Sequence, residues 1–277
     1  MTITPDQIEL FRYTLKNDEK SAATLEKYLR DVRRFAQWLG ERPLNREAVL
    51  DFKDKLMAQF STASVNSMLA ALNSFLRLIG REDCRVHRAR VQFQPYTPEE
   101  RELSVQEYSD LVQTAKNTGR ERMALLLQTL CATGIRISEL SSITVEAARR
   151  GSALVRCKGK SRRVLLPTRL QNKLLRYAKN HRLAYGPIFV TRSGAPMDRS
   201  NIWREMKALC REAGVSERKV FPHNLRHLFA RSFYRLNRDL AKLADLLGHS
   251  SINTTRIYIR TTSAEHRRCL ERMRLVL

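Results

Sequence analysis

Apolar side chains recur at helical spacing through the first part of the chain. In residues 21–39 they fall at every third or fourth position, which is the pattern of an amphipathic helix. Residues 64–79 repeat this pattern and are followed by Gly80, a residue type that commonly ends helices. A weaker helix is predicted between them, over residues 45–60. We therefore expect roughly the first 90 residues to form a small all-helical domain.

The pattern changes after this region. Residues 90–101 contain two prolines and no helical period, so we place a linker at 93–102, between a domain at 1–92 and a second domain at 103–277. Ser104 and Glu107 are spaced as a capping box, which predicts the start of a helix. Residues 152–167 then alternate around a basic turn, which predicts a β-hairpin.

Further helices are predicted from helical spacing and from the residues at their ends. Gly134 would stop one helix, and Pro222 stands where proline is favoured, at the first helical position of another. The predicted ranges are 121–133, 169–182, 200–213, a helix from 222, 239–247 and 252–259. The predicted fold class is therefore mainly α with a small β-hairpin or sheet, a helical N-terminal domain preceding a mixed, mostly helical one.

Positive charge is concentrated in the second part of the chain. The 277 residues include 51 Lys or Arg and 28 Asp or Glu, a formal net charge of +23. Up to Pro98 there are 16 basic and 12 acidic residues, which leaves 35 basic and 16 acidic residues, a net charge of +19, for the remainder. This asymmetry predicts a polyanionic partner held mainly by the second domain. A solvated basic surface is the plain alternative.

Several classes of protein are not indicated. No run of about 18 apolar residues predicts a membrane span, and the first residues show no secretory signal pattern. The five cysteines are scattered without a CxxC pair, so they predict reduced thiols and no zinc site. We therefore expect a cytoplasmic protein without a zinc site.

Two arginines, two histidines and a tyrosine occur in an order that suits phosphate chemistry. An arginine grips phosphate oxygens through two parallel hydrogen bonds and stays charged at any relevant pH. A tyrosine can attack phosphorus and conserve the bond energy in a phosphotyrosyl link. The residues, in chain order, are Arg136 in ATGIRISEL, His223 and Arg226 on one helix face in HNLRH, His249, and Tyr258 nine positions later.

Proton transfer completes this chemistry. A phenol of pKa about 10 needs help at neutral pH, which His223 or His249 could supply, and Lys158 on the hairpin turn is suited to protonate the leaving 5′-oxygen. Each feature alone has an ordinary interpretation: HxxR arises easily in a basic chain, a helical tyrosine is usually a core aromatic, and a basic turn is usually solvated. Their order and type together favour metal-free DNA strand cleavage by a tyrosine.

In this order the motifs resemble those of the tyrosine recombinases, the phage-integrase and Xer-type strand transferases, over nearly the whole chain. The resemblance implies a helical core-binding domain that clamps DNA, followed by a catalytic domain from about residue 99. It also implies roles for single residues: Arg136 and Arg226 as phosphate clamps, Glu139 as an accessory brace, His223 in acid–base work, His249 as a transition-state hydrogen-bond donor and Tyr258 as nucleophile.

The hairpin and the first domain supply the remaining candidates. CKGKSRRVLLP resembles the family's hairpin motif and implies Lys158 as general acid, with Lys160 as the alternative because the usual Gly–Lys–Gly spacing is lacking. Short polar residues at the start of the helix at 64–79 suit helix capping and would equally suit phosphates at a helix N-terminus. The DNA contacts expected are Thr62, Ser64, Asn66, Lys160, Arg162 and Arg163.

The same resemblance implies no metal or nucleotide cofactor, and it implies the partners. They are double-stranded DNA with short inverted-repeat core sites, and further copies of the chain: a dimer on each site and a synaptic tetramer that exchanges strands through a Holliday junction. Leu270, Met273 and Leu277 form a stripe in the C-terminal tail that fits docking on a neighbouring protomer as well as on its own domain. The rival functions are a type IB topoisomerase and a DNA-binding protein that regulates or bends DNA without cutting it.

Overall fold

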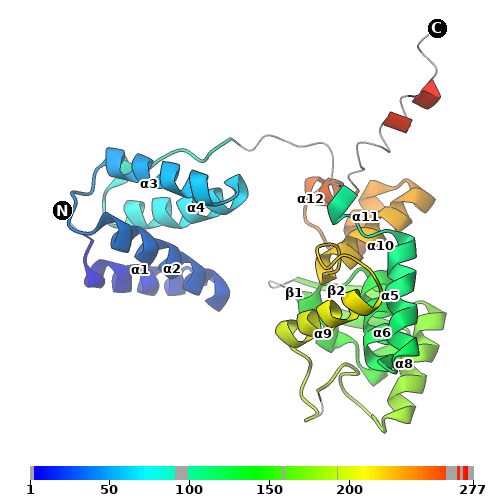
Figure 1. Ribbon diagram of the computed structural model, residues 1–277. Coiled ribbons are helices and arrows are strands. Elements are labelled where there is room, and N and C mark those ends of the chain that lie inside the picture. Colours follow the sequence, from blue (N-terminus) through cyan, green and yellow to red (C-terminus); the bar gives the residue numbers. More distant parts are fainter. Residues whose placement is uncertain are drawn as a thin grey trace. The chain divides into compact units, whose positions relative to one another are not determined.

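The computed structural model describes residues 3–90, 99–157, 160–191, 193–259, 267–268 and 271–273. The chain divides into two compact units, Met1–Phe93 and Gln94–Leu277. Figure 1 shows the first unit in blue to cyan and the second in green to red. The division falls at the start of the predicted linker, 93–102, whose own bounds stay a prediction because residues 91–98 lie outside the described part.

The first unit is helical, as predicted. It contains α1 (Pro5–Asn17), α2 (Ala22–Leu39), α3 (Arg46–Gln59), α4 (Thr62–Leu78) and the short 3₁₀ turn η1 (Glu82–Cys84). A side-chain oxygen just before each α-helix accepts a hydrogen bond from a first-turn backbone N–H, which fixes where the helix begins. These capping residues are Thr4, Ser21, Asn45 and Ser61.

Aromatic side chains build the core of this unit. Phe11 of α1 meets Phe75 of α4 with ring centroids 5.4 Å apart, and Phe35 of α2 meets Phe52 of α3 at 5.0 Å. All four rings are buried. The sequence analysis missed α1, which buries only Phe11 and Leu15 and so carries a weak apolar stripe.

Two asparagines of α4 hold the chain that follows this helix. The Asn66 side chain donates to the Ala89 carbonyl oxygen at 2.9 Å and accepts from its N–H at 2.8 Å. Asn73 makes the same pair of bonds with Val86, at 2.8 and 3.2 Å. A side-chain amide carries one donor group and one acceptor, so it pairs with an extended backbone as a neighbouring strand would. The amide of Asn66 is thereby committed to the protein itself.

The second unit is mostly helical around one small sheet, which confirms the predicted fold class. The strands β1 (Ser152–Cys157) and β2 (Lys160–Leu165) pair antiparallel, with Cys157 opposite Lys160. Each predicted helix start or end agrees with the observed one to within one or two residues, the usual uncertainty of helix ends. Only the start was predicted for the helices that begin at Val105 and Pro222. The predicted helices are α5 (Val105–Asn117), α6 (Glu121–Thr133), α8 (Thr168–Asn180), α9 (Arg199–Glu212), α10 (Pro222–Asn237), α11 (Leu240–Leu247) and α12 (Ile252–Tyr258).

Helix α6 lies at the centre of this unit and packs against α5, α8 and α10 (Figure 1). It is buried on most sides, as its apolar composition predicts. Gly134 ends it in the left-handed conformation, with φ of 62°. A Cβ at this position would collide with the ring of Phe229 on α10, so both the backbone and the packing require glycine.

Short elements that the sequence analysis did not predict connect α6 to the hairpin. They are the 3₁₀ helix η3 (Ile137–Ser142) and α7 (Val145–Arg150), which packs on α8 and β1; η2 (Glu99–Arg101) precedes α5. At the other end of the unit, α12 packs on α10 and α11. None of the described helices combines the length and apolar character needed to cross a membrane.

Candidate active site

A buried carboxylate organises one side of the site. Arg136 stands just before η3, and its backbone N–H and its Nη1 donate to the two oxygens of Glu139, at 2.8 and 3.1 Å. The Glu139 side chain is 1% exposed, whereas that of Arg136 is 34% exposed. Glu139 therefore fixes the base of the Arg136 side chain and leaves part of its guanidinium open to a ligand.

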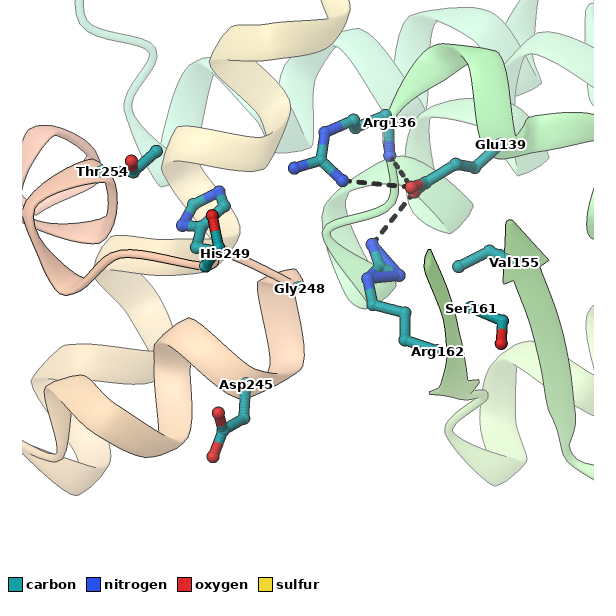
Figure 2. A pocket seen from close by; sticks show the side chains of 10 residues that line it. Arg136, Glu139, Val155, Ser161, Arg162, Asp245, Gly248, His249 and Thr254 are labelled. Carbon is teal, nitrogen blue, oxygen red and sulfur yellow. Dashed lines mark hydrogen bonds and ion pairs between the residues drawn. The ribbon is translucent and has the colours of Figure 1, made fainter. Parts of the chain in front are cut away.

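The hairpin reaches the same carboxylate. Arg162 of β2 donates from Nη2 at 3.0 Å to the Glu139 Oε2, the same oxygen that accepts from the Arg136 backbone N–H. Figure 2 shows both guanidinium groups converging on Glu139. Arg162 is paired in register with the buried Val155, so it lies on the inner face of the hairpin. The Arg162 side chain passes close to Gly248, where an added Cβ would lie 2.5 Å from the Arg162 Cδ.

Arg226 lies on the opposite side and is almost wholly buried, with 1% exposure. Its Nη1 donates to the carbonyl oxygen of Gly134, and its Nη2 donates to that of Leu247 at 2.6 Å. Burial, and then the positive charge of Arg136, lower the pKa of Arg226 to about 10, so the guanidinium stays charged at neutral pH. Arg226 thus ties the ends of α6 and α11 together while it carries a charge into the site.

His249 bridges Arg226 and α12. Its Nε2 lies 3.0 Å from the Arg226 Nη2, and its Nδ1 lies 2.9 Å from the Thr255 Oγ1. Burial first, then the charges of Arg226 and Arg136, lower the pKa of His249 to about 4. The ring is therefore neutral at pH 7 in this ligand-free state.

Tyr258 is packed among imidazole rings. Its ring centroid lies 4.3 Å from that of His227 and 5.0 Å from those of His223 and His249. The Arg226 guanidinium carbon lies 5.6 Å from the tyrosine ring centroid. Burial, and then Arg226 and Arg136, lower the pKa of His223, which favours a neutral imidazole that can accept a proton. Tyr258 is only 7% exposed.

A pocket of about 520 Å³ opens between these two sides. Two guanidinium groups, of Arg136 and Arg162, and two carboxylates, of Glu139 and Asp245, line it. With the buried guanidinium of Arg226 behind them, these groups sum to a charge of +1, which suits an anion such as a phosphodiester. Figure 2 shows His249 across the pocket from Glu139. The lining residues are Arg136, Glu139, Val155, Ser161, Arg162, Asp245, Gly248, His249, Ser250 and Thr254.

The structure thus brings together the residues predicted for catalysis that it describes: Arg136, Glu139, His223, Arg226, His249 and Tyr258. Lys158, the predicted general acid, lies outside the described residues, as does the side chain of Lys160. Arg163 is exposed on the outer face of β2, opposite Leu154, whereas Arg162 points inward to Glu139. The sequence analysis missed His227 and Thr255, although their spacing from His223 and Tyr258 along their helices was a usable signal.

The candidates of the first unit lie at the start of α4. The cap of this helix is Ser61, whose Oγ accepts from the Ser64 N–H at 3.4 Å and lies 3.0 Å from the Ser64 Oγ. Thr62 is the first helical residue. Asn66 differs from these residues, because both of its amide groups bind Ala89.

Among the described residues, no group of three or more His, Cys, Asp and Glu side chains is placed to hold a metal ion. The arginines, histidines and tyrosine on a helical scaffold define a phosphodiester-handling class of protein. The chain belongs to the phage integrase family: residues 101–265 match this family, and residues 8–83 match the phage integrase N-terminal SAM-like domain.

Individual relatives agree with this assignment. The chain is 30% identical over 284 residues to tyrosine recombinase XerA of Pyrococcus furiosus, an alignment that covers 99% of this chain and 96% of the relative. Its fold is similar to that of a lambda integrase dimer bound to a COC′ core site, with a TM-score of 0.75, 17% identity and coverage of 94% and 95%. A lambda integrase tetramer bound to a Holliday junction gives a TM-score of 0.73, 16% identity and coverage of 91% and 76%.

Proposed function

We propose that this chain is a site-specific DNA recombinase that cleaves and rejoins strands through a covalent bond to Tyr258. The observation that carries the proposal is the convergence of Arg226, His223 and His249 on the Tyr258 ring, beside a pocket that Arg136 and Arg162 line. Membership of the tyrosine recombinases supports the same chemistry.

In the proposed reaction the Tyr258 oxygen attacks the scissile phosphorus. A 3′-phosphotyrosyl bond forms, the bond from phosphorus to the 5′-oxygen breaks, and the phenol proton passes to a base, for which the neutral His223 is suited. Arg136 and Arg226 hold the non-bridging oxygens, whose negative charge increases in the transition state. Lys158 would protonate the departing 5′-oxygen, with Lys160 as its alternative.

Rejoining reverses these steps with a 5′-hydroxyl of the partner strand. The phosphotyrosyl bond keeps the free energy of the broken diester, so no external energy source is needed. We propose duplex DNA with short inverted repeats as substrate, a dimer on each site, and a tetramer that passes through a Holliday junction. The solved lambda integrase dimer and tetramer, each bound to DNA, support this assembly by analogy of fold.

The flanking features have roles in the same proposal. The first unit, with Thr62 and Ser64 at the start of α4, would clamp DNA together with the basic second unit. The tail after Tyr258, in which Met273 is 54% exposed, would dock on a neighbouring protomer. A cytoplasmic location follows from the proposed DNA substrate.

Two rival functions predict different products. A type IB topoisomerase would relax supercoiled DNA without joining two sites, and a non-catalytic regulator would form no covalent adduct. Similarity to Xer recombinases over nearly the whole chain favours recombination. The proposed cleavage by a tyrosine needs no metal ion, so it should survive excess EDTA.

The DNA around the gene is first searched for short inverted repeats, and a nicked suicide duplex that carries such a repeat then tests the proposal. The wild-type protein should form a covalent adduct that survives denaturing electrophoresis in EDTA and without ATP, and a supercoiled plasmid with two such sites should give recombinant circles. The Tyr258→Phe variant should bind the duplex and form no adduct. Relaxed plasmid without recombinants would favour the topoisomerase, and binding by both proteins without any adduct would favour the regulator.

A further inference from the structure

Thr255 is, with Tyr258, one of the two residues of α12 that are buried. It precedes Tyr258 by three positions, so the two side chains share one helix face, and it is 0% exposed. Its Oγ1 lies 2.9 Å from the His249 Nδ1. A buried hydroxyl is costly without a partner, and here the partner belongs to the site.

The contacts of His249 define where its proton sits. A guanidinium has donors and no acceptor, so the Arg226 Nη2 donates to the His249 Nε2 at 3.0 Å, and Nε2 must present its lone pair. The neutral ring therefore carries its hydrogen on Nδ1, which donates to the Thr255 Oγ1. The low pKa of His249 agrees with a neutral ring.

This tautomer is the wrong one for the reaction. A histidine that hydrogen-bonds a phosphate oxygen must donate, yet in the free site Nε2 accepts from Arg226. When a phosphate takes up the donors of Arg226, Nε2 loses this partner and can carry the hydrogen itself. The ring then releases its Nδ1 proton to water and takes one from water at Nε2, so its charge does not change.

A hydroxyl can serve both tautomers, because it accepts from Nδ1–H and donates to a bare Nδ1 by rotating about its Cβ–Oγ1 bond. We propose that Thr255 is a positioning residue that holds the His249 ring in both states, so that Nε2 changes from an acceptor for Arg226 to a donor for the scissile phosphate. This inference rests on the proposed strand cleavage.

Three variants in the full-length protein test the role in cleavage. Thr255→Val keeps the shape of the side chain and removes the hydroxyl. It should slow cleavage of bound suicide duplex about tenfold, the effect of losing one hydrogen bond of ordinary net strength. Its affinity for DNA should change little. Thr255→Ser should recover the rate to within about twofold. Thr129→Val is the matched control: Thr129 is equally buried and bonds the Leu125 carbonyl oxygen at 2.8 Å within α6, so its variant should cleave normally.

Nitrogen-15 NMR of histidine-labelled protein tests the tautomers, with the His249 signal assigned by its loss in His249→Gln. The free protein should show a protonated Nδ1, and the Tyr258→Phe protein bound to the duplex should show a protonated Nε2. A protonated Nε2 in the free protein, or normal cleavage by Thr255→Val, overturns the inference while wild-type adducts keep the proposed function. If the wild-type protein forms no adduct, the proposed function is refuted. The NMR spectrum of the free protein then still tests the predicted tautomer on its own.

Discussion

The two arginines predicted to clamp the phosphate have opposite surroundings. Arg226 is 1% exposed and spans the carbonyl oxygens at the ends of α6 and α11. The Arg136 side chain is 34% exposed, and its guanidinium is paired with the carboxylate of Glu139. The buried arginine thus supports the fold as well as the proposed chemistry, whereas the open one is available mainly for the ligand.

Arginine can therefore be placed to bind a phosphate from a buried position or from an open one, and the two positions differ in what they require of the fold. A buried guanidinium is stabilised only because carbonyl oxygens and a neutral imidazole surround it. An exposed guanidinium needs only orientation, which the buried Glu139 supplies. Substitution of Arg136 should therefore affect catalysis alone, whereas substitution of Arg226 should affect both stability and catalysis.

The largest effect is expected for Arg226→Ala. Each buried acceptor left without its donor costs about 1–3 kcal/mol, so the loss at the Gly134 and Leu247 carbonyls should lower the free energy of unfolding measurably in urea. Cleavage of bound DNA should fall at least as far as for one lost transition-state donor, on the order of 10²–10³. An Arg226→Ala protein as stable as the wild type would contradict the structural half of this comparison.

Arg136→Ala should lose cleavage and keep stability. We expect the rate on bound suicide duplex to fall about 10²–10³-fold, while the free energy of unfolding changes by less than about 1 kcal/mol because this ion pair is partly exposed and Arg162 still neutralises Glu139. DNA affinity, measured by titration at fixed salt, should change little. A large loss of affinity with normal cleavage of the bound DNA would make Arg136 an ordinary phosphate contact.

A smaller effect is expected where the loop after α11 passes the hairpin. Gly248→Ala places a Cβ in a backbone with φ of 66° and against the Arg162 side chain. Gly214→Ala is the matched control, since its φ is 65° and nothing lies within 4 Å of the added Cβ. Both should lose about 1–2 kcal/mol from the left-handed backbone, and only Gly248→Ala should also slow cleavage. Equal cleavage by the two variants would show that the contact with Arg162 has no role in the reaction.

The helical fold and much of the site could be predicted from the sequence, because both rest on local spacing. The capping box at Ser104 and the glycine stop at Gly134 marked helix ends correctly. Arg226 was predicted as a clamp, but nothing in HNLRH shows that its donors reach the Gly134 and Leu247 carbonyls, since those contacts span 92 and 21 positions. The inward turn of Arg162 likewise depends on the hairpin register. The spacing of Thr255 from Tyr258 indicated a shared helix face, but not the contact with His249, which lies on the loop before α12.

The smallest effect is expected for the pH dependence of stability, which reports on the buried His249. The pKa of His249 is about 4 in the folded protein, against about 6.5 for an unperturbed histidine. Between these values the unfolded chain binds the proton and the folded one does not, so stability should fall as pH drops from 6.5 toward 4. His249→Gln should show a shallower fall in melting temperature over this range, with the remaining slope carried partly by His223, whose pKa is also lowered. An unchanged slope would contradict a neutral, buried His249.

The central claim is that Tyr258, which lies beside Arg226 and three histidine rings, is the nucleophile. Wild-type protein trapped on the nicked suicide duplex can be digested with protease, and the peptide that carries the oligonucleotide can be identified by mass spectrometry. We predict that the phosphodiester link lies on Tyr258 in the α12 peptide, and that Tyr258→Phe yields no modified peptide. Attachment to another residue, with Tyr234 of α10 as the first alternative, would contradict the account.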